Sequence, residues 1–265
     1  MKYVKIFLLH FQEATDERSR MFVWFLISLI NPLVYLLFWR GAHTSLPETT
    51  NQWQLSGFAS YYVLLILAGS FLRVHIEEYI AYYDIELGYL ANSLLKPVSY
   101  FWYQFFHELP YRLLETSFGI LVFLLFVINL PGLIQLTGKL EYILLSIFIL
   151  FAGYFLSYLL KISLGLSALF TTDFRGLSEL LEVTLLLFGG FVLPLDLFPD
   201  TLKQFLFVLP FPYMFYFPVV AFLGRLTIEE LLKTIVIQLT WIVGFMILYR
   251  IIWNKGIRLF TGVGR

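Results

Sequence analysis

Residues 21–38 carry the sequence MFVWFLISLINPLVYLLF, an uncharged stretch whose polar break lies at Ser28 and Asn31-Pro32. As a helix, this stretch would extend about 27 Å, close to the roughly 30 Å hydrocarbon core of a bilayer. Comparable apolar blocks recur, and they predict six spans at about 21–41, 55–74, 100–129, 140–170, 177–194 and 229–253. We therefore expect an all-α integral membrane protein with one transmembrane domain over residues 1–265.

The composition supports this class and excludes several others. Hydrophobic residues make up 60% of the chain and charged residues 14%, whereas soluble domains average about 45–50% and about 25%. Basic and acidic residues number 18 each, so no electrostatic attraction to nucleic acid is expected. The absence of cysteine excludes disulfides, thiolate metal sites and cysteine catalysis.

The distribution of lysine and arginine predicts the orientation of the chain. Beside the expected spans, eleven basic residues lie on one side: Lys2, Lys5, Arg18, Arg20, Arg73, Lys96, Arg175, Arg250, Lys255, Arg258 and Arg265. Four lie on the other side: Arg40, Lys139, Lys203 and Arg225. This asymmetry predicts a multi-pass protein with both termini in the cytoplasm.

Two further segments are apolar or amphipathic without being expected to cross the membrane. Residues 1–20 place Tyr3, Phe7 and Phe11 on one stripe, which is typical of a helix lying in the membrane interface. Residues 195–225 contain four prolines, which exclude one straight helix and favour short re-entrant helices on the outer side.

Residues 75–97 form an amphipathic cytoplasmic segment between the second and third expected spans. Its apolar side chains recur at helical spacing: Ile76, Ile80, Tyr83, Leu87, Leu90 and Leu94. Its carboxylates fall largely off that stripe: Glu77, Glu78, Asp84 and Glu86. Gly88 is unfavourable inside a helix, so we expect a break there.

Charged residues inside the expected spans are candidates for function, because an unpaired charge in hydrocarbon is costly. Glu108, Arg112 and Glu115 share one face of the third span and can pair along it. They form either the charged cytoplasmic end of a long helix or a polar stripe that faces a partner subunit or the transport path.

Lys161 and Glu182 lie at comparable depths in two neighbouring spans, so we expect them to pair. The pair either pins the two helices together or takes part in gating.

An aromatic cluster at residues 211–222 includes Tyr213, Phe215, Tyr216 and Phe217. It either lines an exit for an apolar substrate or forms an aromatic girdle at the outer interface.

The sequence predicts no catalytic residue and no metal site. It contains neither a G-x-x-x-x-G-K-[ST] phosphate loop nor an H-E-x-x-H motif, and its four histidines are scattered over different segments: His10, His43, His75 and His107.

Three segments in order resemble one family: DIELGYLANSLLKPVSY at 84–100, LPFPYMFYFPVVAFLG at 209–224 and WNKGIRLFTGVGR at 253–265. With six spans and an interfacial helix, they resemble the bacterial type 2 ABC export permeases. The chain departs from that family at Glu86, where a basic residue is expected, and at Leu259-Phe260, where Arg-Tyr is common.

The resemblance implies a non-enzymatic membrane subunit of an ATP-driven exporter in the bacterial inner membrane, with a hydrophobic or amphipathic substrate. ATP and Mg²⁺ would be bound by a separate cytoplasmic ABC ATPase, and the chain itself would hold no cofactor. Its other partners would be a second permease subunit, the same or a similar one, and membrane lipids. The ATPase would dock on the cytoplasmic segment through Glu77, Glu78, Asp84, Glu86, Leu87, Gly88 and Leu90.

Two other functions remain open at this point. A membrane scaffold that recruits a cytoplasmic partner would use the same amphipathic segment. A secondary transporter is disfavoured, because the chain shows no internal repeat and no matching pair of Gly/Pro-broken spans.

Overall fold

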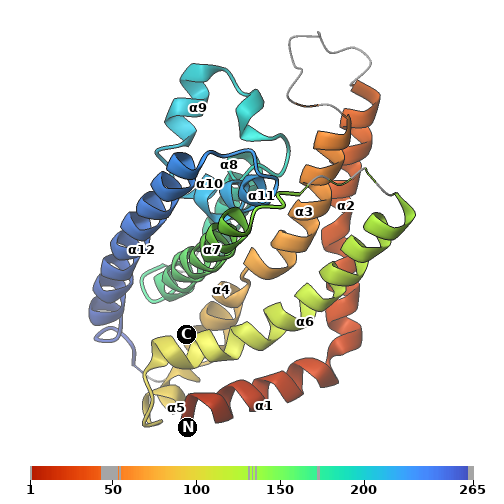
Figure 1. Ribbon diagram of the computed structural model, residues 1–265. Helices are drawn as coiled ribbons and strands as arrows, with labels where there is room; N and C mark the ends of the chain where they lie inside the picture. The colour runs from red at the N-terminus through yellow and green to blue at the C-terminus, as the bar shows by residue number, and fades with distance from the viewer. Residues whose placement is uncertain are drawn as a thin grey trace.

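A computed structural model describes residues 2–42, 53, 55–130, 132, 134, 136–171 and 174–261. His43 and the last four residues of the C-terminal segment, 262–265, lie outside the described residues. Within those ranges the chain is helical and has no strand, which confirms the predicted all-α class. Figure 1 shows the helices as a bundle, with α1 lying across one end of it.

The helical elements follow one another as α1 (Lys2–Asp16), α2 (Arg18–Ala42), α3 (Leu55–Leu72), α4 (Ile76–Tyr79), η3 (Ile80–Glu86), α5 (Leu90–Leu94), α6 (Tyr100–Asn129), α7 (Leu140–Ser167), α8 (Phe174–Phe188), η4 (Leu195–Leu197), α9 (Asp200–Leu206), α10 (Phe211–Met214), α11 (Tyr216–Phe222) and α12 (Ile228–Gly256). The segment η3 is a π-helix and η4 is a short 3₁₀ helix.

Five helical stretches of the described chain are long and apolar enough to cross a membrane. They are 18–39, 56–86, 100–129, 140–167 and 228–256. The expected span at 177–194 is different, because α8 ends at Phe188 after 15 residues and would extend only about 22 Å. The six-span layout therefore stays a prediction.

The core of the bundle is built around α3 and α7. Helix α3 packs against α2, α6, α7 and α11, while α7 packs against α12, α11 and α4. By contrast, α2, α6 and α12 expose large apolar side chains such as Trp24, Leu121 and Val236, each at least 60% exposed. Such broad apolar surfaces are expected where helices face lipid.

The segment between α3 and α6 is broken into short pieces that lie against the core. Gly88 has φ +77°, a conformation that side chains other than glycine rarely adopt, so the predicted break at this residue is confirmed. Helix α4 packs closely on α7 at Gly165, where an added Cβ would lie 2.9 Å from the Ile80 Cβ and 3.0 Å from the Glu77 Cα.

Candidate functional site

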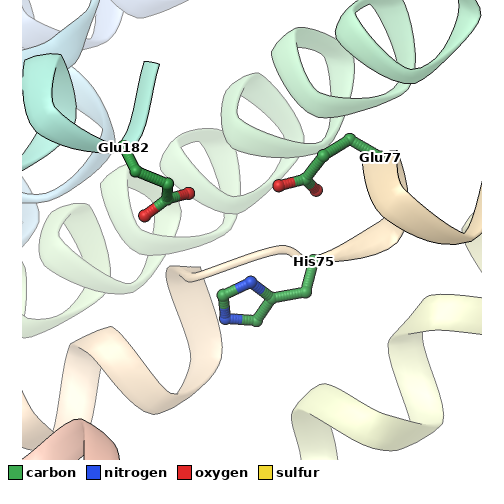
Figure 2. A group of neighbouring side chains, drawn as sticks. All are labelled: His75, Glu77 and Glu182. Atoms are coloured by element: carbon green, nitrogen blue, oxygen red, sulfur yellow. The ribbon is translucent and has the colours of Figure 1, made fainter. Parts of the chain in front are cut away.

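Lys161 of α7 is buried in the centre of the bundle and binds two carboxylates from other elements. Its ammonium contacts one oxygen of Glu77 from α4 and one oxygen of Glu182 from α8. The expected contact between Lys161 and Glu182 is therefore present, and Glu77 is a second partner that the sequence did not reveal. Figure 2 shows Glu77 and Glu182 reaching into the same space from opposite sides, with His75 beside them.

The burial of these groups explains why the contact matters. The side chains of Lys161 and Glu77 are 1% and 3% exposed, whereas that of Glu182 is 45% exposed. A buried charge is tolerated only with close partners, and removal of one partner leaves the other uncompensated. Lys161 therefore holds α4, α7 and α8 together.

The same carboxylates, with His75, form a group that has the chemistry of a metal site. His75, Glu77 and Glu182 can each offer one ligand atom, and these atoms lie within 4.8 Å of one another. Imidazole and carboxylate together suit several divalent ions. However, the Lys161 ammonium already bridges the two carboxylates, and a metal ion would have to displace it. The geometry therefore favours an ion triad over a metal centre.

A second charged cluster lies on α6, where Arg112 contacts Glu108 at 2.8 Å and Glu115 at 2.5 Å. All three residues are 6–7% exposed. The predicted pairing along one helix face is confirmed. The three side chains turn into the interior of the same chain, so within it they face neither solvent nor a partner subunit. A place on the transport path stays a prediction.

The inward orientation of this cluster has a local cause at the break between α3 and α4. Arg112 donates a hydrogen bond of 2.7 Å to the Arg73 carbonyl, and Glu108 accepts one of 3.2 Å from the His75 backbone N–H. These backbone groups fall outside both helices and need partners when they are buried. The charged face of α6 supplies them.

The carboxylates of the 75–97 segment divide into two sets. Asp84 is 2% exposed and accepts hydrogen bonds of 2.6 Å from the Tyr100 hydroxyl and from Gln104 Nε2. Glu77 is likewise buried. The expectation that all four carboxylates face a partner is therefore wrong for Glu77 and Asp84, and only Glu78 and Glu86 are exposed.

The other residues that were expected to contact the ATPase are also partly exposed and partly buried. Leu87 is exposed, while Gly88 and Leu90 are buried. The exposed face also contains Tyr82 and Tyr89, which the sequence did not single out, and Tyr83, which the sequence placed on the apolar stripe. For Tyr82 and Tyr83 the cause is the π-helix η3, whose wider i→i+5 turn rotates the side chains away from the 3.6-residue pattern.

The aromatic cluster at 211–222 belongs to the core. Tyr213, Phe215, Tyr216 and Phe217 are 1–7% exposed. The aromatic-girdle alternative is wrong for these four residues, because none reaches the surface. Their backbone lies against α7, where a Cβ on Gly153 would be 3.2 Å from the carbonyl oxygens of Tyr213 and Met214. An exit path through this cluster stays a prediction that requires the rings to move.

A cavity of about 210 Å³ lies next to the Lys161 triad, among α2, the end of α3, α7 and α8. Its apolar wall consists of side chains of α8 with Val74, Phe191 and Phe215. Its polar lining consists of Asn31, Arg73, Ser157, Lys161 and Glu182.

An all-helical bundle with several membrane-length helices and lipid-compatible outer faces defines a multi-pass membrane protein. Residues 29–264 match the family described as "ABC-2 family transporter protein", and the chain belongs to this family. The match confirms the resemblance to ABC-2 type permeases, and membership implies association with an ABC ATPase. The comparison with curated proteins found no match.

Proposed function

We propose that this chain is the permease subunit of an ATP-driven exporter and forms the translocation pathway for a hydrophobic or amphipathic substrate. The observation that carries the proposal is the two-sided construction of residues 75–97. One side is fixed to the bundle by the buried carboxylates of Glu77 and Asp84. The other side leaves Glu78, Glu86 and Leu87 exposed for a partner.

This construction suits a segment that receives force from an ATPase and passes it to membrane helices. Through Glu77 and Lys161, α4 is linked to α7 and α8. Through Asp84, η3 is linked to Tyr100 on α6, whose ring stacks on Trp253 of α12 at 4.8 Å. Movement of the segment would thus reach α6, α7, α8 and α12 as a rigid-body shift.

The chain has no phosphate-binding motif of its own, so the proposal assigns ATP binding and hydrolysis to a partner. A separate ABC ATPase binds ATP and Mg²⁺ and hydrolyses the nucleotide, and the chain itself has no enzymatic activity and no cofactor. A second permease subunit completes the complex. The protein lies in the bacterial inner membrane among lipids, with both termini in the cytoplasm.

Docking is tested by charge reversal on the exposed face. Glu78→Lys with Glu86→Lys should reduce co-purification of the ATPase, because exposed charges at an interface set orientation and choice of partner. Glu229→Lys, which reverses an exposed carboxylate on α12, is the matched control. Full retention of the ATPase by the double variant, at low and at high salt, would reject docking on this face.

Transport itself is tested in vesicles that contain the chain with or without the ATPase. Export that requires both the ATPase and ATP supports the proposal. If the complex forms but no ATP-dependent movement of any amphipathic compound follows, the chain is a scaffold that recruits the ATPase.

A further inference from the structure

Arg73 is a partly exposed cation, and no carboxylate contacts it directly among the described residues. Its guanidinium lies at the cavity beside the Lys161 triad, with Cζ 5.0 Å from the centre of the Phe191 ring. Glu115 and Glu182 are near enough to act on it through space, but within the described ranges no carboxylate forms an ion pair with it. A guanidinium that lines a cavity without a contacting carboxylate is free to bind an anionic ligand there.

The Ser157 hydroxyl, like the Arg73 guanidinium, lines the cavity without a bonded partner in the described part of the chain. It is 1% exposed on α7 and lines the cavity. The neighbouring serines of the helix, Ser146, Ser163 and Ser167, donate their hydroxyls to carbonyls of α7 itself. Among the residues that the structure describes, the Ser157 hydroxyl has no such partner, and the side-chain amide of Asn31, which is exposed on α2, has none either.

These three groups surround one space, and each of them donates hydrogen bonds. The charged residues that line it are two cations, Arg73 and Lys161, and one carboxylate, Glu182. Glu182 is already bound to Lys161, so the charge that faces the cavity without a contact is that of Arg73. The guanidinium presents a planar fork that matches the oxygens of a phosphate or a carboxylate.

The size and walls of the cavity define the rest of the ligand. Its volume of about 210 Å³ is enough for a head group but not for a whole lipid. Its remaining wall is apolar, and its rim reaches the surface at Asn31 and Val183, which is 53% exposed. An apolar tail attached to the head group can leave there toward the membrane.

We propose that this cavity binds the anionic head group, a phosphate or a carboxylate, of an amphiphile, through Arg73, Ser157 and Asn31. The proposal rests on the proposed function and deepens it, because it names the chemical class of the transported molecule.

Binding is measured on the purified chain in phosphatidylcholine nanodiscs, without ATPase or ATP. The probes are lysophosphatidic acid, oleate, the neutral monooleoylglycerol and inorganic phosphate. Wild-type protein should bind the two anionic amphiphiles, and Arg73→Gln should weaken this binding about tenfold to a hundredfold, because hydrogen bonds to charged groups are among the stronger ones. Arg225→Gln is the matched control, since Arg225 also lies over an aromatic ring, 3.7 Å from the centre of Trp53, but does not line the cavity.

A stability measurement separates binding from a structural role. Without ligand, Arg73→Gln should melt close to the wild-type temperature, because the partly exposed Arg73 side chain forms no direct ion pair within the described residues. Arg73→Lys, which keeps the charge and loses the fork, should bind with intermediate affinity.

Three results would overturn the proposal. The first is equal affinity of wild type and Arg73→Gln for lysophosphatidic acid, and the second is a marked loss of stability in Arg73→Gln without ligand. The third is binding of monooleoylglycerol, or of phosphate alone, as tight as that of lysophosphatidic acid. Because the assay needs no ATP, Arg73-dependent binding without ATP-driven movement would reject the exporter and keep the site, whereas ATP-driven transport unaffected by Arg73→Gln would reject the site alone.

Discussion

Lys161 and Arg112 each bind two glutamates in the interior of the bundle, but they connect different parts of the chain. Arg112 and its partners all lie on α6, three and four residues apart. Lys161 takes one partner from α4 and one from α8. The Arg112 cluster therefore holds a local break in place, whereas the Lys161 triad joins three separate elements, α4, α7 and α8. Similar chemistry serves a structural role in one place and a candidate coupling role in the other.

The largest expected effect is on the Arg112 cluster. Arg112→Leu leaves two buried carboxylates and the Arg73 carbonyl without their partner, and should cost about 3–5 kcal/mol of stability. Thermal unfolding in detergent measures this loss, with the exposed Arg250→Leu as control. A loss no larger than that of the control would show that water reaches these carboxylates.

A smaller loss of stability is expected at Lys161. Lys161→Met leaves the buried Glu77 carboxylate without its partner, whereas the half-exposed Glu182 can be solvated. The free energy of unfolding should therefore fall by about 2–3 kcal/mol. Glu77→Gln added to Lys161→Met should restore more stability than Glu182→Gln added to the same variant. Equal recovery, or purely additive effects in both double-mutant cycles, would show that the contact with Glu77 is not special.

The smallest of these effects is expected at the packing contact beneath the triad. Gly165→Ala places a Cβ about 3 Å from α4, so α4 must shift, at a cost of about 1–2 kcal/mol. Gly244→Ala on α12, where a Cβ would meet nothing within 4 Å, is the control. If Gly165→Ala is as stable as its control, the close packing of α4 on α7 is wrong.

The difference between the clusters also shows what the sequence can predict. The Arg112 pairs follow from helical spacing within one long helix, and the span positions of α2, α6, α7 and α12 follow from apolar length. The Lys161–Glu182 contact followed from depth in neighbouring spans. The contact between Lys161 and Glu77 was not predicted, because the carboxylates of residues 75–97 were expected to face a partner. Glu77 and Lys161 are also far apart along the chain, so their contact leaves no local sequence signal.

Two other features depend on tertiary structure in the same way. The π-helix turns Asp84 inward and Tyr82 and Tyr83 outward, and no periodicity analysis based on 3.6 residues per turn predicts this. Helix α8 ends at Phe188, where Gly189 and Gly190 bring the chain close to Phe215 and Tyr216, although the apolar sequence continues to Leu195. Apolar composition alone therefore overestimates the length of this helix.

The most direct test of the Lys161 triad as a coupling element is the ratio of substrate exported to ATP hydrolysed in reconstituted vesicles. The triple variant Lys161→Met, Glu77→Gln, Glu182→Gln removes the charges without leaving one unpaired, so the protein should fold and bind the ATPase. We expect ATP hydrolysis close to that of wild type and export reduced by about tenfold or more, because a link worth on the order of 1.4 kcal/mol changes an equilibrium tenfold. An unchanged ratio of export to hydrolysis in the folded triple variant would contradict this role of the triad.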